Sequence, residues 1–182
     1  MKFTDSTILA YIAGFLDGDG SIFSQIVKTK SSKENPFKIR TSIAFYQKTT
    51  NVIILETLKG ILKSGYIRYR KTDVSDYTIV ESPEVKRILN LLFPYVRLKT
   101  EHIKLALEII SQTEKEQTIN EFIETCKLVD RFEKLNYSKK RKIKASTVED
   151  YFKSKFFTPV ETEAKAESLV TFDESFVKRF QG

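Results

Sequence analysis

The stretch from Ile8 to Ser21 constrains the fold of this chain more than any other. Its apolar residues recur at the spacing of one helical face, and they are Ile8, Leu9, Ile12, Phe15 and Leu16. Small residues recur four apart on another side, at Ala10, Gly14 and Gly18. Because a glycine within a helix costs about 1 kcal/mol relative to alanine, this stripe predicts close approach of a second helix. The acidic Asp17–Gly20 segment then ends the helix at about Leu16.

Three simpler interpretations of this stretch compete with that one. A core helix that ends in a turn is one, since Asp-Gly and Gly-Ser pairs are common in loops, and it stays open on the pattern alone. A calcium-binding EF-hand loop that starts at Asp17 is excluded, because its sixth position is Ile22 and its twelfth is Lys28, where glycine and glutamate are required. A transmembrane helix pair is excluded because the apolar stretch is far shorter than about 20 residues.

The nine residues from Ile12 to Gly20, IAGFLDGDG, resemble the signature of the LAGLIDADG homing endonucleases. The resemblance implies that Asp19 binds the divalent metals that cleave DNA and that Asp17 is mainly structural. The backbone carbonyl of Gly18 is a further candidate ligand. Only one copy of the motif is present, which implies a homodimer with the motif helices at its interface. The interface residues expected are Ala10, Ala13, Gly14 and Asp17.

The rest of the chain predicts an α+β fold. Strand patterns at 21–27, 37–47, 65–70 and 76–80 are interleaved with three helical patterns, in the order αββαββα. This order predicts a four-stranded antiparallel sheet with helices on one face, and the resemblance makes it saddle-shaped. Further helices follow toward the C-terminus. We expect an endonuclease domain over residues 1–155 and a tail over 156–182, in which an apolar stripe is compatible with a short docking helix.

The uncovered face of this sheet carries basic and polar side chains. Alternation along the strands assigns to it Gln25, Lys38, Arg40, Ser42, Tyr46, Arg68, Arg70 and Thr78. Such side chains suit readout of base edges in the major groove, although an ordinary solvated sheet face is also polar. The resemblance adds Lys48 and Asp76 to a DNA interface. It also places a loop with Lys139, Lys140 and Lys142 against the DNA backbone, where these residues would anchor phosphates.

Two further segments carry the resemblance beyond the motif. Gln47-Lys48-Thr49 matches a family segment whose glutamine orders water at the active site, and Lys99 matches a lysine near the scissile phosphate. The implied catalytic residues are therefore Asp19, Gln47 and Lys99. One position departs from the family pattern, since Asn51 stands where many members have an arginine.

The charge balance favours a polyanionic partner. Residues 1–155 contain 28 Lys or Arg against 19 Asp or Glu. The single Cys126 excludes an internal disulfide framework and a multi-cysteine metal site. No membrane association and no small-molecule cofactor are expected. The resemblance implies a gene within a group I intron and synthesis in an organelle, either a chloroplast or a mitochondrion.

These features together predict a homodimeric endonuclease that cuts both strands of a long pseudo-palindromic DNA site. Phosphodiester hydrolysis needs an activated water and stabilised oxygens, which a divalent metal supplies; a carboxylate ligand suits Mg²⁺, with Mn²⁺ as a substitute. The alternative is a non-cleaving intron maturase or a DNA- or RNA-binding regulator, which would not need Asp19, Gln47 and Lys99 together. For His102, the only histidine, a surface or capping role is favoured over a catalytic one.

Overall fold

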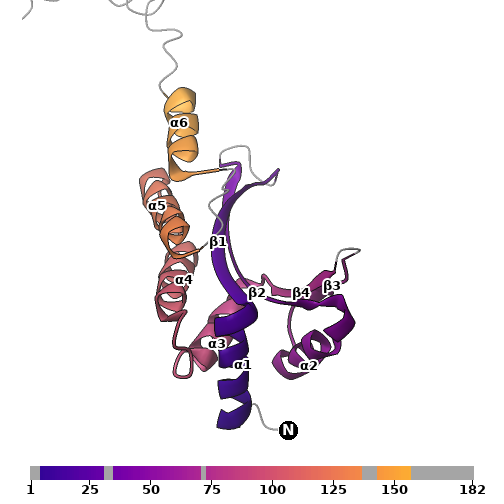
Figure 1. Cartoon of the computed structure of the whole chain (residues 1–182). Helices are drawn as coiled ribbons and strands as arrows, with labels where there is room; N and C mark the ends of the chain where they lie inside the picture. Colours follow the sequence, from indigo (N-terminus) through magenta and orange to yellow (C-terminus); the bar gives the residue numbers. More distant parts are fainter. Residues whose placement is uncertain (1–4, 31–34, 71–72, 137–142, 157–182) are drawn as a thin grey trace, which may run out of the picture. The chain divides into compact units, whose positions relative to one another are not determined.

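The computed structural model describes residues 5–30, 35–70, 73–136 and 143–156 of the 182-residue chain. The chain divides into two compact units, Met1–Val148 and Glu149–Gly182, which are described separately. In the first unit, helices and strands follow in the order α1 (Ser6–Asp19), β1 (Gly20–Lys28), β2 (Phe37–Lys48), α2 (Ile53–Leu62), β3 (Tyr66–Arg68), β4 (Val74–Ile79), α3 (Ser82–Leu92), α4 (Thr100–Thr113) and α5 (Ile119–Leu135) (Figure 1). A last helix, α6 (Ala145–Phe156), runs across the boundary between the units. The predicted αββαββα order is confirmed.

The four strands form one antiparallel sheet in the order β1-β2-β4-β3. β1 pairs with β2 along its whole length, whereas β4 pairs only with the C-terminal half of β2. The sheet is strongly curved, and α1 to α5 lie on its convex side (Figure 1). Helices α1 to α5 therefore all cover one face of the sheet and leave its other face uncovered, as predicted (Figure 1).

The core lies between the sheet and these helices. Ile22, Ile43 and Ile79 stand opposite one another on three neighbouring strands and are fully buried. Burial of each such side chain contributes about 1.5–3 kcal/mol. Ser24 and Thr41 also point into the core, where their hydroxyl oxygens are 2.8 Å apart and hydrogen-bonded. The alternation of buried residues thus fixes which face of each strand meets the helices.

The motif helix α1 is longer than expected. Asp5 caps its N-terminus, since the carboxylate accepts a hydrogen bond from the Thr7 N–H at 2.9 Å. At the other end the helix continues three residues past Leu16, and the N–H of Gly20 still donates to the Leu16 carbonyl. Asp19 is consequently the last residue of the helix.

Other element boundaries also differ from the prediction. β3 is only three residues long, and α2 begins at Ile53 after a short 3₁₀ turn at Thr49–Asn51 with no side-chain cap. Gly65 lies at φ 79°, and a Cβ atom there would be 2.4 Å from the Thr78 carbonyl oxygen, so the turn before β3 requires glycine. At the start of α5, Thr118 and Glu121 form a capping box.

The proposed tail, from residue 157 onward, lies outside the described residues, so its division from an endonuclease domain stays a prediction. Among the helices that are described, none is long and apolar enough to cross a lipid bilayer.

Candidate active site and nucleic-acid interface

Asp17 joins the end of α1 to the loop between α3 and α4. Its carboxylate accepts hydrogen bonds from the backbone N–H groups of Arg97, Leu98 and Lys99, at 2.7, 3.1 and 3.0 Å. Three successive N–H groups that converge on one anion form a stable nest, and they directly precede α4. This arrangement fits the structural role that the resemblance implied for Asp17. The motif helix and the lysine-bearing loop, about 80 positions apart in sequence, are therefore held as one piece.

Lys99 is attached to the same helix end through its side chain. Its ammonium Nζ donates to the Asp17 backbone carbonyl oxygen at 2.6 Å. Burial lowers the pKa of Lys99, while the nearby charges of Asp17 and Asp19 act in the opposite direction, and the net pKa lies below its ordinary value. Two of the three predicted catalytic residues, Asp19 and Lys99, thus lie within electrostatic range of each other.

Asp19 is exposed at the last position of α1. Within the described part of the chain its carboxylate makes no hydrogen bond or ion pair, so both oxygens are available. Gly18 is also exposed, and its carbonyl is one of the last four that a helix leaves without an internal partner. These two oxygen donors fit Mg²⁺, which takes few protein ligands and keeps waters or substrate oxygens in its remaining positions. The described residues contain no cluster of three or more His, Cys, Asp or Glu able to hold a metal on their own.

A cavity of about 750 Å³ opens beside this helix end. It is bounded by α1, β1, the loop before α4 and the end of α5, and its lining residues are Asp17, Gly18, Gly20, Ser21, Phe23, Ser24, Gln25, Tyr46, Leu98, Lys99, His102, Leu135 and Asn136. Of the three predicted catalytic residues, Lys99 lines this cavity, whereas Asp19 and Gln47 do not. The side chain of Gln47 is turned toward the adjacent backbone. Its side-chain oxygen accepts a hydrogen bond from the Lys48 N–H at 2.8 Å, and no hydrogen bond links it to Asp19 or Lys99 in the described residues.

The predicted DNA-facing residues share one face of the sheet. Strand register places Gln25 opposite Arg40, Tyr46 opposite Asp76, and Arg68 opposite Asp76 on its other side. By the same alternation Lys38, Ser42, Lys48 and Thr78 belong to this face. Gln25, Lys38, Arg40, Lys48, Arg68 and Arg70 are exposed, so the accessible part of the face is mainly basic.

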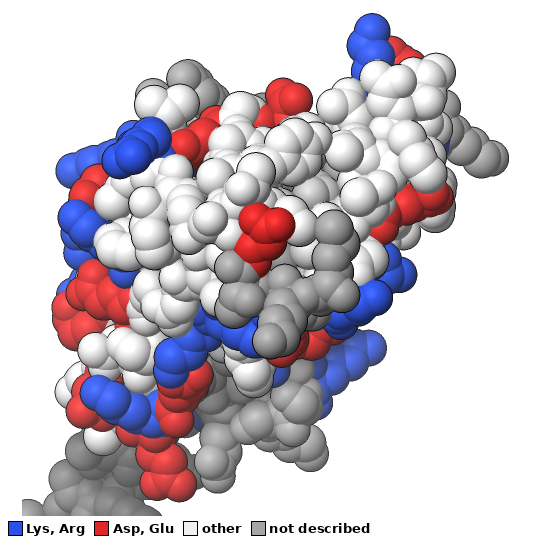
Figure 2. Space-filling model, turned by 90° about the horizontal axis from the view of Figure 1, so that it is seen from below, with Lys and Arg blue, Asp and Glu red and all other residues white. Residues whose placement is uncertain are grey.

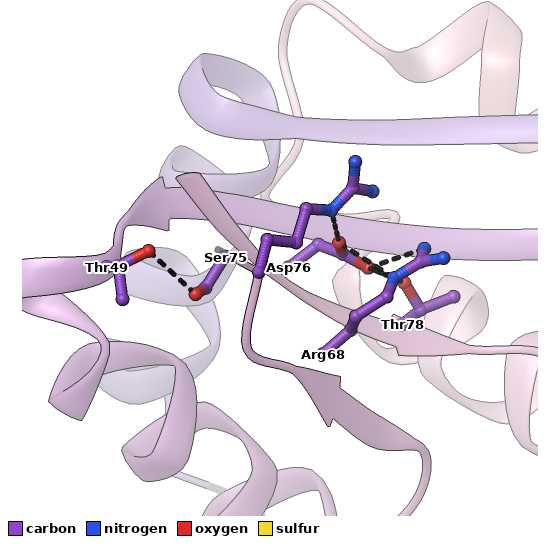
Figure 3. Close-up of polar contacts among 6 residues, drawn as sticks. Thr49, Arg68, Ser75, Asp76 and Thr78 are labelled. Atoms are coloured by element: carbon purple, nitrogen blue, oxygen red, sulfur yellow. Dashed lines mark hydrogen bonds and ion pairs between the residues drawn. The ribbon is translucent and has the colours of Figure 1, made fainter. Parts of the chain in front are cut away.

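Asp76 organises the arginines of this face. Its carboxylate, only 1% exposed, accepts hydrogen bonds from Arg68 and from the Arg70 Nε at 2.7 Å, and Thr78 donates a third at 3.0 Å (Figure 3). Burial would raise the pKa of Asp76, but these hydrogen bonds outweigh it and hold the pKa below its ordinary value. Asp76 therefore fixes the direction of two arginines and is itself inaccessible.

Two groups of predicted DNA-binding residues differ from the exposed set. Ser42 and Thr78 lie on the predicted DNA-facing side of the sheet but are buried, at 1% and 6% exposure. The basic residues Lys139, Lys140 and Lys142 lie outside the described residues.

The predicted interface helix exposes small side chains. Ala10, Gly14 and Gly18 are exposed along α1, and a Cβ atom added at Gly14 or Gly18 would meet nothing within 4 Å. Figure 2 looks at the side toward which the N-terminus of α1 points, where uncharged residues fill much of the middle of the view. Ala13, by contrast, is fully buried and packs in the core of this chain.

Sequence patterns did not reveal two of these features. The link between Asp17 and the 97–99 loop depends on tertiary structure alone. The Nε2 atom of His102 lies 3.1 Å from the Leu135 carbonyl oxygen, which fits the favoured capping role. His102 also lines the same cavity as Lys99, which the sequence did not indicate.

Comparison with known proteins identifies a family and individual proteins that are similar to this chain. A family model described as LAGLIDADG endonuclease matches residues 12–106. DNA endonuclease I-CreI of Chlamydomonas reinhardtii is 39% identical over 143 residues, which cover 77% of this chain and 85% of the relative. DNA endonuclease I-CvuI of Chlorella vulgaris is 33% identical over 155 residues, covering 84% and 94%.

Two crystal structures of I-CvuI are similar to the present fold, each with a TM-score of 0.78 and 32% identity over 84% of this chain and 97% of that chain. In one, I-CvuI is bound to the I-CreI target in the presence of 2 mM Mg and the DNA is not cleaved; in the other it is bound to its own target in the presence of 2 mM Ca. The motif at the end of α1, the sheet topology and these relatives together show that the chain belongs to the LAGLIDADG endonuclease family.

Proposed function

We propose that this chain is a site-specific homing endonuclease that makes metal-dependent double-strand breaks in a long pseudo-palindromic DNA site, acting as a homodimer. The observation that carries the proposal is the free carboxylate of Asp19 beside Lys99, at a helix end that Asp17 fixes to the loop before α4. A protein that only binds nucleic acid would have no need of this arrangement.

Asp19 and the Gly18 carbonyl are the groups that would hold the metal. A bound Mg²⁺ or Mn²⁺ would activate a water and stabilise charge on the phosphate and leaving oxygens. Because Asp19 is solvent-exposed and makes no competing ion pair in the described residues, its carboxylate is free to bind a metal ion, which would in turn attract the DNA phosphate. The cavity next to it leaves room for the reacting phosphate.

Lys99 would neutralise charge that develops on the scissile phosphate. Its ammonium is held close to Asp17 and Asp19 before DNA arrives, so little reorganisation is needed when the phosphate binds. Gln47, whose side chain here turns back to the Lys48 N–H, would change partner to orient a water. This role of Gln47 is inferred from the family resemblance, and the side chain would adopt it only when DNA is bound.

DNA would lie on the free face of the sheet. Arg68 and Arg70, held by Asp76, present guanidinium groups in a fixed direction, and arginine pairs well with the acceptor edge of guanine. Gln25 and Arg40 stand opposite each other on β1 and β2, where they would read further base edges. Lys38, Lys48 and the 139–142 run would contact phosphates, which makes binding salt-dependent.

The homodimer follows from the need to cut two strands with a chain that has one motif. A partner helix packed on the Ala10, Gly14 and Gly18 stripe would bring a second Asp19 close to the first. Two-fold protein symmetry then predicts a nearly palindromic site. We retain, as part of this proposal, a gene within a group I intron and synthesis in an organelle.

The test is cleavage of candidate insertion sites by the purified chain. A library of ribosomal RNA gene sequences is incubated with the protein in Mg²⁺, in Mn²⁺ and in Ca²⁺. We expect double-strand cuts at one sequence in Mg²⁺ or Mn²⁺, and binding without cutting in Ca²⁺. Because I-CvuI bound the I-CreI target without cleaving it in 2 mM Mg, the Mg²⁺ series should extend well above that concentration.

The opposite outcome is equally specific. Tight, sequence-selective binding with no cut in any metal would favour the maturase or regulator alternative. Failure to bind any nucleic acid would contradict both the endonuclease proposal and the maturase or regulator alternative.

A further inference from the structure

His102 lies in the first turn of α4, three residues after Lys99, and its ring lines the same cavity. Its Nε2 is 3.1 Å from the carbonyl oxygen of Leu135, the last residue of α5. A carbonyl oxygen can only accept, so Nε2 carries the proton and donates. The side chain of His102 therefore supplies a hydrogen bond to one of the carbonyls that the end of α5 leaves unpaired.

The other ring nitrogen is in a different position. Nδ1 is buried and has no hydrogen-bond partner among the described residues. In a neutral ring Nδ1 is an acceptor without a donor, whereas a protonated ring would place a buried charge here; the Asn136 side chain favours the charged form but does not outweigh burial. The geometry favours the neutral ring.

The surroundings of the ring act in the same direction. Burial is the largest influence and lowers the pKa of His102; the hydrogen bond to Leu135 raises it, the Lys99 charge lowers it, and Asn136 and Asp17 raise it, leaving a pKa below the ordinary value. Phe132, Leu135 and Asn136, which α5 places near the ring, carry no charge. Of the described residues, Lys99 and Asp17 are the charged groups that act on it.

Lys99 thus lies between two anchors. Before it, the backbone N–H groups of residues 97–99 bind the Asp17 carboxylate in α1. After it, His102 joins the first turn of α4 to the end of α5. The Asp17 anchor fixes the loop, and the His102 anchor fixes how the helix that starts at Thr100 leaves that loop.

We propose that His102 is a positioning residue for Lys99, and that it acts as a neutral imidazole whose Nε2–H locks the first turn of α4 to the end of α5. The role in catalysis rests on the function proposed above. Protonation of Nδ1 would place a second, buried cation beside Lys99. DNA cleavage would then decline on acidification.

Two substitutions separate the hydrogen bond from the titration. His102→Phe keeps a flat ring but has no donor; His102→Gln keeps an N–H donor at a similar reach and cannot titrate in this range. We expect His102→Phe to slow single-turnover cleavage about tenfold, the effect of one lost hydrogen bond at a positioned group, while affinity for the same DNA in Ca²⁺ stays within about threefold. His102→Gln should recover most of the rate at pH 7.5 and flatten the acid limb of the pH profile.

A matched control is Lys104→Gln, on an exposed side of the same helix, where Lys104 pairs with Glu101. It should keep the wild-type rate and pH profile. The proposal is overturned if His102→Phe cleaves at the wild-type rate, or if His102→Gln keeps the full acid limb.

Because His102 is the only histidine, a second readout needs no nuclease activity. Long-range ¹H–¹⁵N spectra of the tag-free chain show one imidazole, which should be neutral and Nε2-protonated at pH 7. In ¹³C-lysine-labelled protein, with Lys99 assigned through Lys99→Arg, the Lys99 signal should move in His102→Phe. A charged or Nδ1-protonated ring, or an unmoved Lys99 signal, would refute the positioning role even if the chain cuts DNA; expected spectra without any cutting would refute only the nuclease.

Discussion

At the scale of single residues, Asp76 joins the stability of the sheet to its use as a binding face. Asp76→Asn would remove the charge that faces Arg68 and Arg70 and turn amide hydrogens toward two donors. We expect the free energy of unfolding to fall by about 1–3 kcal/mol and specific DNA affinity to fall about tenfold, because both arginines lose their fixed direction. Urea unfolding and competition binding in Ca²⁺ measure the two effects.

Thr78→Val is the matched control for that change. It removes only the neutral hydroxyl that donates to the same carboxylate at 3.0 Å and leaves both ion pairs in place. The loss of stability should be no more than about 1 kcal/mol, with little change in specificity. If Asp76→Asn were as mild as Thr78→Val, the two arginines would not depend on Asp76.

A second prediction at this scale concerns pH. The folded-state pKa of His102 is lowered, whereas in the unfolded chain it returns to about 6.5. As the pH falls below about 6.5, the unfolded chain binds the proton first, so the free energy of unfolding decreases until the folded state is protonated too. Urea unfolding at pH 7.5 and 5.5 should show this decrease in the wild type and a smaller one in His102→Gln. Equal decreases would contradict the burial of a neutral ring.

At the scale of elements, aspartate side chains stabilise both ends of α1. Asp17→Ala removes the acceptor of three backbone N–H groups and frees the loop that carries Lys99. We expect a loss of about 2–3 kcal/mol in stability together with a large loss of cleavage.

Asp5→Ala removes the cap at the opposite end of the same helix. It should cost about 1 kcal/mol and leave cleavage unchanged, because it touches neither the loop nor the cavity. A cleavage rate that followed stability alone in both variants would show that Asp17 is only a structural cap.

Local sequence patterns predict most of the helices and strands but not the contacts between them. The strand pattern over residues 37–47 predicts β2 almost to the residue, because the alternation of buried and exposed side chains is a local property of the sequence. The sequence pattern predicts the end of α1 three residues too early, because hydrogen bonds from the distant 97–99 loop stabilise its last turn. Asp17 and His102 also make their contacts with segments far away in sequence, so local patterns do not reveal their roles. Asp19 and Lys99 were recognised only through family resemblance.

At the scale of the whole molecule, the proposed dimer predicts a difference between two exposed glycines. Gly14 in α1 and Gly60 in α2 each have open space where a Cβ atom would be. Gly14→Leu and Gly60→Leu should both leave the protomer folded, and slightly stabilise it, because leucine favours helix by about 1 kcal/mol over glycine. Only Gly14→Leu should block close helix contact and dissociate the dimer in analytical ultracentrifugation. Equal dimerisation by both variants would exclude this face of α1 from the interface.

The most direct test of the proposed function compares the wild-type chain with Asp19→Asn on the cognate site. Asp19 is exposed and makes no hydrogen bond or ion pair in the described structure, so the substitution should leave the fold and the unfolding curve unchanged. We predict that the wild type cuts both strands in Mg²⁺ in a single-turnover assay, and that Asp19→Asn still binds the site in Ca²⁺ but cuts neither strand. Cleavage by Asp19→Asn at the wild-type rate would contradict the assignment of Asp19 as the metal-binding carboxylate.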